Sequence, residues 1–275
     1  MLLDSRVQKK PRTFADMTLR LQNRTALVTG STSNIGRAIA VALAAEGAHV
    51  IVSGRDVDRG AEVVAAIRAD GGDADFVRAD LTGDPAASHA LAAETLELTG
   101  GRLDILVNNA GVYPLHATED AGADLFDRIY GVNVKAPFHL VQALVPHLSE
   151  HRGVILNLGS WVARLAVPSS PLYSSSKAAM EALTRAWSAE LGPRGIRVIG
   201  VSPGVIRPLG ADPEGPHSSD ALMATAPSGR AGDAHDIAAA AVYLVSDEAS
   251  FVHGTTLDVD GGRANVVISA DRPAA

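Results

Sequence analysis

A tyrosine and a lysine four residues apart, Tyr173 and Lys177, have the residue types and spacing of a proton-exchanging pair. Residues four apart share one face of a helix, so the phenol and the ammonium can point into one cleft. A free phenol has a pKa of about 10, and a nearby cation favours the phenolate. Lowering that pKa by about 3 units takes roughly 4 kcal/mol. Ser160 ends a predicted strand, where its hydroxyl can hydrogen-bond a substrate carbonyl oxygen.

The same segment also matches a different chemistry, because Ser174 and Lys177 have the Ser-x-x-Lys spacing of penicillin-binding hydrolases. However, the chain has no Lys-Thr-Gly and no Ser-Asp-Asn segment, and no Gly-x-Ser-x-Gly surrounds Ser160. We therefore interpret the Ser-x-x-Lys match as a chance one. His147 and His151 are also four apart, but no third ligand is evident, so we interpret them as surface histidines and predict no metal site.

A glycine-containing turn follows the first predicted strand, within TALVTGSTSNIGRAIA at residues 25–40. Gly30 permits a tight turn, and Gly36 is expected to let the next helix approach a pyrophosphate closely. Free N–H groups and the positive end of the helix dipole then hold the anion. The turn therefore predicts a dinucleotide site, with contacts from Gly30, Ser33, Asn34, Ile35 and Gly36.

The end of the second predicted strand indicates which dinucleotide binds. An acidic side chain there would accept hydrogen bonds from an adenosine ribose and repel a 2′-phosphate, but the sequence reads Ser53-Gly54-Arg55. Gly54 is expected to leave space, and the planar fork of Arg55 suits a phosphate. We therefore favour NADP(H) as cofactor, with NAD(H) as the alternative. An arginine on the solvated surface is the other interpretation of Arg55.

Short apolar runs alternate with longer Ala-rich helical stretches along the chain. The predicted strands are Thr25–Val28, His49–Val52, Asp75–Arg78, Ile105–Val107, Val154–Leu158, Arg197–Val201 and Thr256–Val259. The predicted helices span residues 35–46, 57–70, 85–99, 123–149, 173–191 and 234–246. This alternation predicts an α/β fold, namely a single doubly wound Rossmann domain with a seven-stranded, mostly parallel sheet and helices on both faces.

The predicted domain covers residues 21–265, between a loosely ordered N-terminal extension (1–20) and a C-terminal tail (266–275). Residues 207–229 have no regular pattern and contain several prolines and glycines, so we expect a substrate lid there. A plain surface excursion is the alternative. Trp161, Val162, Val205, Leu209 and Met223 are candidates for an apolar pocket or, equally, for the core.

The composition limits the classes of partner. The formal net charge is -7, which disfavours nucleic acid and anionic membranes, although a local basic pocket for a small phosphate remains compatible with it. The chain has no cysteine, which excludes disulfides, thiolate metal sites and cysteine nucleophiles. No apolar run approaches the roughly 18 residues of a membrane span, and residues 1–20 do not resemble a signal peptide. We expect a cytoplasmic protein that acts on a small molecule.

Taken in order, these motifs resemble the short-chain dehydrogenase/reductase family from about Arg24 to Gly262. Residues 29–36 resemble the family's TGxxxGxG turn, and Asn108–Gly111 resembles its NNAG segment. Asp80-Leu81 resembles the acidic pair that touches adenine, Pro203-Gly204 the PG turn below the nicotinamide, and residues 259–262 the VDGG segment. The resemblance implies further cofactor contacts from Asp80, Leu81, Asn109, Ala110, Gly111, Pro203, Gly204, Val205 and Ile206, together with Tyr173 and Lys177.

The resemblance also implies a catalytic tetrad of Asn133, Ser160, Tyr173 and Lys177. In it, Tyr173 exchanges the proton, Ser160 orients the carbonyl, Lys177 binds ribose hydroxyls and tunes Tyr173, and Asn133 holds a relay water. The family implies a homodimer or homotetramer, and carbonyl or alcohol substrates such as 3-oxoacyl thioesters, steroids, sugars or xenobiotic ketones. A cofactor-binding redox sensor without turnover is the alternative function.

Two positions depart from the family pattern. Asn34 stands where a glycine is usual, and asparagine tolerates a left-handed backbone better than most residues. We therefore expect the turn to survive. Pro208 stands where a threonine commonly contacts the nicotinamide carboxamide, and proline has neither that hydroxyl nor a backbone N–H.

Overall fold

The computed structural model describes residues 19–148, 153–165, 168, 170–211 and 218–266. Most of the predicted extension and tail therefore lies outside the described residues. Within them, seven strands form one sheet in the order β3-β2-β1-β4-β5-β6-β7, and every neighbouring pair is parallel. The strands are β1 (Thr25–Thr29), β2 (His49–Gly54), β3 (Asp73–Arg78), β4 (Ile105–Asn108), β5 (Val154–Leu158), β6 (Arg197–Pro203) and β7 (Thr256–Val259).

Eight α-helices in the described ranges connect or flank these strands. They are α1 (Asn34–Ala45), α2 (Val57–Ala69), α3 (Pro85–Leu98), α4 (Ala123–Tyr130), α5 (Ala136–Leu144), α6 (Pro171–Leu191), α7 (Ser218–Met223) and α8 (Ala234–Val245). Short π or 3-10 turns are η2 (Gly131–Lys135), η3 (Val145–His147), η4 (Trp161–Ala163), η5 (Gly192–Arg194) and η6 (Asp247–Ala249). Apart from the long helix predicted over 123–149, the predicted elements agree with these bounds to within two residues.

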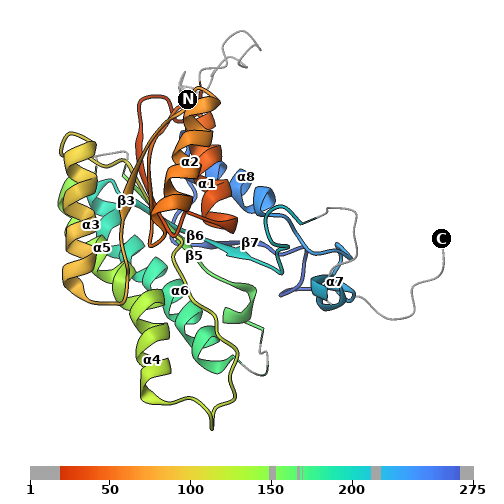
Figure 1. Ribbon diagram of the computed structural model, residues 1–275. Helices are drawn as coiled ribbons and strands as arrows, with labels where there is room; N and C mark the ends of the chain where they lie inside the picture. The colour runs from red at the N-terminus through yellow and green to blue at the C-terminus, as the bar shows by residue number, and fades with distance from the viewer. Residues whose placement is uncertain (1–18, 149–152, 166–167, 169, 212–217, 267–275) are drawn as a thin grey trace, which may run out of the picture.

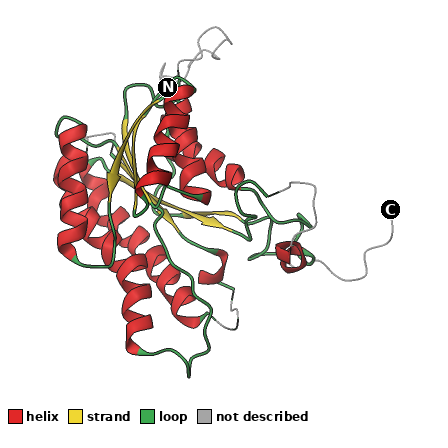
Figure 2. Cartoon of the chain, in the orientation of Figure 1, coloured by secondary structure: helices red, strands yellow, loops and turns green. Residues whose placement is uncertain are grey.

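The strands are apolar on both faces because helices cover both faces of the sheet (Figures 1 and 2). Successive strand residues point to opposite sides. In β1, Ala26 and Val28 pack with α1, α2 and α8, whereas Leu27 packs with α3, α5 and α6. The predicted doubly wound Rossmann fold is confirmed, and its sheet is entirely rather than mostly parallel.

Local sequence signals set several helix starts. The side chains of Asp56 and Asp84 accept backbone N–H groups at the starts of α2 and α3, and Asp233 forms a capping box with Asp236 at the start of α8. Each of these caps satisfies N–H groups that the helix itself cannot pair. The beginnings of these three helices are therefore fixed by the aspartates that directly precede them.

The single helix predicted over residues 123–149 is wrong, because the chain forms α4, a π turn, α5 and a 3-10 turn there. Pro137 has no N–H to donate to the Asn133 carbonyl four residues earlier. Instead, the Ala136 N–H bonds to the Gly131 carbonyl, five residues back. A Cβ atom at Gly131 would also collide with the Thr82 carbonyl oxygen. The resulting bulge is the place where Asn133 enters the structure, and such bulges are frequent at functional sites.

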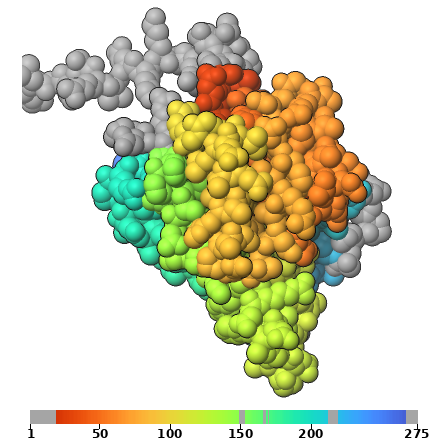
Figure 3. Space-filling view, turned by 60° about the vertical axis from the view of Figure 1, so that its left-hand side comes forward, coloured from red at the N-terminus to blue at the C-terminus, as the bar shows by residue number. Residues whose placement is uncertain are grey.

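The strand order creates a switch point, since β1 pairs with β2 on one side and β4 on the other. Open parallel sheets bind ligands at such a point, outside the carboxyl ends of the strands. The loop after β4 and helix α4 project from the body of the molecule, as the yellow-green segment in Figure 3 shows. Helix α7 stands apart from the helices that flank the sheet (Figure 1).

Candidate active site

A cavity of about 970 Å³ lies at the carboxyl ends of strands β1 to β6. Each of these strands contributes residues at or just beyond its carboxyl end, among them Gly30 after β1, Asn109 after β4 and Ser160 after β5. Every residue predicted to bind the cofactor or to act in catalysis lines this cavity, with the exception of Asn133. Segments far apart in the sequence therefore meet in one place.

The glycine turn is held in shape by the segment that follows β4. Gly30 has a φ of 62°, and a Cβ atom there would come within 2.9 Å of the Ala110 Cα. The Asn109 side-chain amide donates to the carbonyls of Thr29 (2.8 Å) and Gly30 (3.0 Å). The Thr29 hydroxyl accepts the N–H groups of Asn109 and Ala110, each at 3.0 Å. These bonds make the turn and the NNAG segment one rigid unit.

Gly36 is required for a second reason, in addition to the predicted approach to a pyrophosphate, which stays a prediction. A Cβ atom at Gly36 would collide with the Gly30 carbonyl oxygen and with the Asn109 amide nitrogen. The glycine is therefore required by contacts inside the protein, where α1 packs against its own preceding turn. The sequence could not distinguish this requirement from an approach to pyrophosphate, because both need a residue without a side chain.

Asn34 has a φ of 44°, so this residue does adopt the left-handed backbone that it was expected to tolerate. Its side-chain oxygen accepts the Leu209 backbone N–H at 3.2 Å. The two departures from the family pattern are thus neighbours in space, since Leu209 directly follows Pro208. The Asn34 side chain ties the start of the predicted lid segment to the glycine turn.

Polar groups gather at the end of the cavity formed by β2 and β3. Arg55 is two-thirds exposed and lies 3.8 Å from Asp80, an ion pair that solvent weakens. The space above Gly54, expected to be open, holds the Thr32 side chain, whose methyl carbon would lie 2.7 Å from a Cβ atom at this glycine. Ser53 also lines the cavity, and its buried hydroxyl oxygen has no protein partner.

The proposed proton-exchanging groups converge at the opposite end. The Ser160 hydroxyl lies close enough to the Tyr173 phenol to lower its pKa, and the Lys177 ammonium lies 5.8 Å from the centre of the Tyr173 ring. Ser160 also accepts the Val162 N–H at 3.5 Å, as the N-cap residue of η4. Helix α6 supplies Tyr173 and Lys177 from one face, and β5 ends just before Ser160. The expected convergence of these three side chains is present.

The pKa of the Tyr173 phenol is shifted in the direction opposite to the expected lowering. Burial raises the pKa of the Tyr173 phenol, and the neighbouring Ser160 hydroxyl lowers it by less. Burial also lowers the pKa of Lys177 to about 8. The Lys177 side chain is buried and donates a 2.8 Å hydrogen bond to the Leu158 carbonyl at the end of β5. The lysine alone therefore does not supply the predicted lowering of the phenol pKa.

The Asn133 side chain is 1% exposed and forms its hydrogen bonds with other parts of the protein. Its side-chain oxygen accepts the Val112 N–H at 2.8 Å, and its amide donates to the Val112 carbonyl and to the Ser176 hydroxyl, each at 3.0 Å. These bonds tie the π turn to the loop after β4 and to α6. Asn133 thereby fixes α6, which carries Lys177, against the loop after β4.

Comparisons with known proteins agree on the family. A family model described as enoyl-(acyl carrier protein) reductase matches residues 30–264. The chain is 37% identical over 250 residues to cyclopentanol dehydrogenase of Comamonas sp. (strain NCIMB 9872), covering 88% of this chain and 98% of the relative. It is 38% identical over 257 residues to D-threitol dehydrogenase of Mycolicibacterium smegmatis, covering 90% and 95%. The crystal structure of a short chain dehydrogenase from Burkholderia cenocepacia J2315 in complex with NADP superposes with a TM-score of 0.83 at 38% identity, covering 90% and 100%.

The chain belongs to the short-chain dehydrogenase/reductase family. It is an oxidoreductase of alcohol and carbonyl groups, and its family binds a nicotinamide dinucleotide.

The cavity of this dehydrogenase/reductase has the features that a nicotinamide dinucleotide requires. Ser33 begins α1 without a side-chain cap, which leaves the first-turn N–H groups of α1 to bind an anion. The unpartnered Ser53 hydroxyl lies at the same end as Arg55, and the cavity extends without interruption to Tyr173. The residues present thus fit such a cofactor along its whole length.

The substrate end is mainly apolar, and the sequence identified only part of it. Trp161, Val162 and Val205 line the cavity, whereas Leu209 packs on the main core and Met223 lies in a small separate core. The core interpretation is therefore correct for these last two residues. The lining residues that were missed include Val112, Tyr113, Leu115, Ser170 and Leu222. Three of these directly follow the NNAG segment at the switch point, which is the signal that could have identified them.

The hydrolase interpretation gains no support in this dehydrogenase/reductase. Lys177 bonds to the Leu158 carbonyl, while the Ser174 hydroxyl is buried with no partner and does not line the cavity. His147 is exposed, with its ring nitrogen 3.3 Å from the Gly101 carbonyl, and His151 lies outside the described residues. The described part of the chain contains no group of three or more side chains placed to hold a metal ion. None of its helices is long and apolar enough to cross a membrane, and the cytoplasmic location stays a prediction.

Proposed function

We propose that this protein transfers a hydride between NADP(H) and a carbonyl or secondary alcohol substrate, with Tyr173 as general acid and base. The main support is the convergence of Ser160, Tyr173 and Lys177 in the cavity that also contains the glycine turn. A proton donor, a carbonyl-orienting hydroxyl and a dinucleotide site in one cavity are the parts that this reaction needs.

Each residue of the proposed tetrad has a role that follows from its surroundings. In the reducing direction, Ser160 donates a hydrogen bond to the substrate oxygen, and Tyr173 gives that oxygen its proton. Lys177, moved from the Leu158 carbonyl to the ribose hydroxyls, places positive charge near the phenolate that forms. Asn133 joins the loop after β4 to α6 by hydrogen bonds, and it is the candidate residue to hold a relay water. The bound cofactor supplies the hydride and, when oxidised, a further positive charge beside Tyr173.

The substrate is proposed to be a neutral, largely apolar ketone or secondary alcohol. The mouth of the cavity includes Tyr113, Leu115 and Leu222, whose large side chains are 69%, 79% and 52% exposed. Exposed apolar side chains that rim a cavity are typical of a site whose ligand covers them. A xenobiotic or steroid ketone suits such a mouth better than a sugar does, and a 3-oxoacyl thioester would place its apolar chain there.

Turnover distinguishes this function from a redox sensor that only binds the dinucleotide. The assay is NADPH oxidation at 340 nm against a panel of ketones. Tyr173→Phe should lower kcat by at least about 100-fold, because general acid catalysis contributes roughly 10²–10⁴. Tyr130→Phe is the matched control, since the Tyr130 hydroxyl bonds to Ser175 and does not line the cavity. Full activity in Tyr173→Phe would refute the proton role, and binding of NADPH without turnover of any ketone would favour the sensor.

The preference for NADP(H) is proposed from Arg55, which is exposed within the cavity and only loosely paired with Asp80. Arg55→Asp should weaken NADPH use far more than NADH use, because it replaces a phosphate-binding cation with an anion. Arg59→Asp makes the same charge change on α2, at a residue that pairs with Asp56 and does not line the cavity. An equal loss with both cofactors in Arg55→Asp would contradict the assignment.

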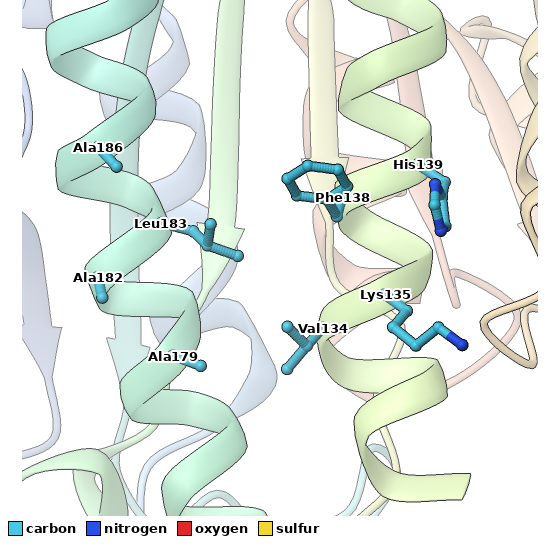
Figure 4. Close-up of a pocket in the computed structure, with 8 residues that line it drawn as sticks. All are labelled: Val134, Lys135, Phe138, His139, Ala179, Ala182, Leu183 and Ala186. Atoms are coloured by element: carbon cyan, nitrogen blue, oxygen red, sulfur yellow. The ribbon is translucent and has the colours of Figure 1, made fainter. Parts of the chain in front are cut away.

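We also propose a homodimer or homotetramer built on α5 and α6. A second cavity of about 450 Å³ lies between these helices, lined mainly by apolar residues. Figure 4 shows Val134, Phe138 and Leu183 pointing into the space between the helices, while Lys135 and His139 point away. Phe138 is 44% exposed, and the alanines of α6 allow a second copy to approach closely. A two-fold axis would pair this face with itself.

Light scattering after size exclusion tests the assembly. Ala182→Glu places a charge on the proposed interface and should yield monomers, whereas Ala65→Glu, on the exposed face of α2, should leave the assembly unchanged. Monomers in the unmodified protein would overturn this proposal without affecting the catalytic one.

The lid over residues 207–229 stays a proposal, and residues 212–217 lie outside the described residues. Its described parts are joined by the Arg207–Asp220 ion pair at 2.7 Å, and α7 contributes Leu222 to the cavity. Hydrogen exchange in α7 should slow when NADPH and a ketone analogue bind together. Unchanged exchange would favour a plain surface excursion.

A further inference from the structure

Ser170, directly before α6, has a hydroxyl without a hydrogen-bond partner among the described residues. The residue is 5% exposed and lines the large cavity, and its hydroxyl oxygen is buried without a hydrogen-bond partner. Buried polar groups in proteins are nearly always paired. An unpaired hydroxyl in the wall of a ligand cavity therefore indicates that the ligand supplies the partner.

The local backbone makes this serine unusual. Serine is a favoured N-cap residue because its oxygen accepts an N–H of the first helical turn. Asp56, Asp84 and Asp233 do this at their helices, but Ser170, with φ -156° and ψ 45°, makes no such bond. Its hydroxyl is thus left buried and without a partner at the positive end of a 21-residue helix. A hydrogen-bonding oxygen is the group that this end attracts.

Ser170 lies close in the chain to Tyr173, the proposed proton donor. It precedes Tyr173 by three residues, about one helical turn, and both residues line the same cavity. The side chains that line the cavity near Ser160 and Tyr173 include the largely apolar Val112, Trp161 and Val162, and also Tyr113, whose ring centre lies 6.0 Å from that of Tyr173. A substrate oxygen directed to Ser170 would thus be distinguished from mainly apolar surroundings.

We propose that Ser170 binds a second oxygen of the substrate, and that the preferred substrates are ketones or alcohols with a hydroxyl or carbonyl group a few bonds from the reacting carbon. This inference rests on the proposed function, since Ser160 and Tyr173 must hold the first oxygen. The hydroxyl of Ser170 can donate to a carbonyl or exchange hydrogen bonds with a hydroxyl. Ser170 is then a specificity-determining residue rather than a participant in the proton transfer.

The test compares pairs of ketones that differ by one hydroxyl: butan-2-one with 3-hydroxybutan-2-one, and cyclohexanone with 2-hydroxycyclohexanone. For each enzyme, kcat/KM with NADPH gives a ratio of hydroxyketone to simple ketone. The difference in intrinsic reactivity between the two ketones cancels when this ratio is compared between variants. Ser170→Ala should lower the ratio about three- to tenfold, as loss of one neutral hydrogen bond does. It should leave the simple ketone within about twofold.

Two further variants separate recognition from helix capping. Ser170→Gly keeps a residue that caps helices almost as well as serine but lacks the hydroxyl, so it should lower the ratio as Ser170→Ala does. Ser170→Thr keeps the hydroxyl and should keep the ratio. Thermal unfolding checks that each variant is folded.

The outcomes are distinguishable. A ratio that is the same in the unmodified enzyme and in both hydroxyl-free variants overturns the inference but leaves the proposed function intact. An equal loss on both ketones in Ser170→Ala and Ser170→Gly also overturns it, because it shows a structural role. If the unmodified enzyme reduces no ketone of either pair while it binds NADPH, the proposed function fails and the substrate subsite fails with it.

Discussion

Replacing Lys177 with methionine should make the protein without cofactor more stable at neutral pH while removing its activity. Burial lowers the pKa of Lys177 from 10.5 to about 8, so folding at pH 7 must bury a charge that water solvates better. At about 1.36 kcal/mol per pKa unit, the burial costs roughly 3 kcal/mol. Methionine has a similar shape without the charge. The variant loses the hydrogen bond to the Leu158 carbonyl, which is worth about 1 kcal/mol, so its net gain is about 2 kcal/mol.

The stability difference between the unmodified protein and Lys177→Met should depend on pH in a definite direction. Below about pH 8 the lysine is charged in both the folded and the unfolded state, and the full cost applies. Between pH 8 and 10.5 the folded protein holds the neutral amine while the unfolded chain still binds the proton, so the cost falls as pH rises. The unmodified protein should therefore gain roughly 2 kcal/mol relative to Lys177→Met between pH 7 and pH 10.

Urea unfolding followed by circular dichroism at pH 7, 8, 9 and 10 measures the difference. Both proteins need the same concentration, because an oligomer's stability depends on it. A stability gap that does not change with pH would refute the reasoning, since burial of a titrating amine would then not be its cause. A variant less stable than the unmodified protein at pH 7 would show that the hydrogen bond outweighs the buried charge.

Three further predictions concern the site and its frame. Burial raises the pKa of Tyr173, and alcohol oxidation needs the phenolate. Initial rates of oxidation should therefore rise from pH 7 to pH 10, while rates of ketone reduction should fall at the alkaline end. An oxidation rate independent of pH would contradict this. Gly36→Ala should cost about 1–3 kcal/mol in urea unfolding, because its methyl group collides with the preceding turn, whereas Gly122→Ala, with nothing within 4 Å, should cost far less. Asn133→Ala removes three hydrogen bonds and should lower the free energy of unfolding by about 2–3 kcal/mol. It should also lower kcat, because these bonds hold α6, and with it Lys177, against the loop after β4. Unchanged stability would show that water replaces those bonds.

The sequence by itself determined the kinds of elements and the order of the motifs. Strand and helix periodicities depend on local backbone geometry, so the predicted ranges for β5 and β7 match the structure residue for residue. The spacing of Tyr173 and Lys177 likewise requires only one helix, and α6 places both on one face. The chemistry of the site was therefore predictable wherever it depends on residues close together in the chain.

Only the tertiary structure decided the properties that depend on residues distant in sequence. The collision that requires Gly36 involves Asn109, which comes from the other side of the switch point. The raised pKa of Tyr173 and the lowered pKa of Lys177 arise from burial beneath several segments. The unpaired hydroxyl of Ser170 is likewise meaningful only beside a cavity that six strands build together. Burial and partnership are properties of packed surroundings, and local sequence does not encode which distant segment provides them.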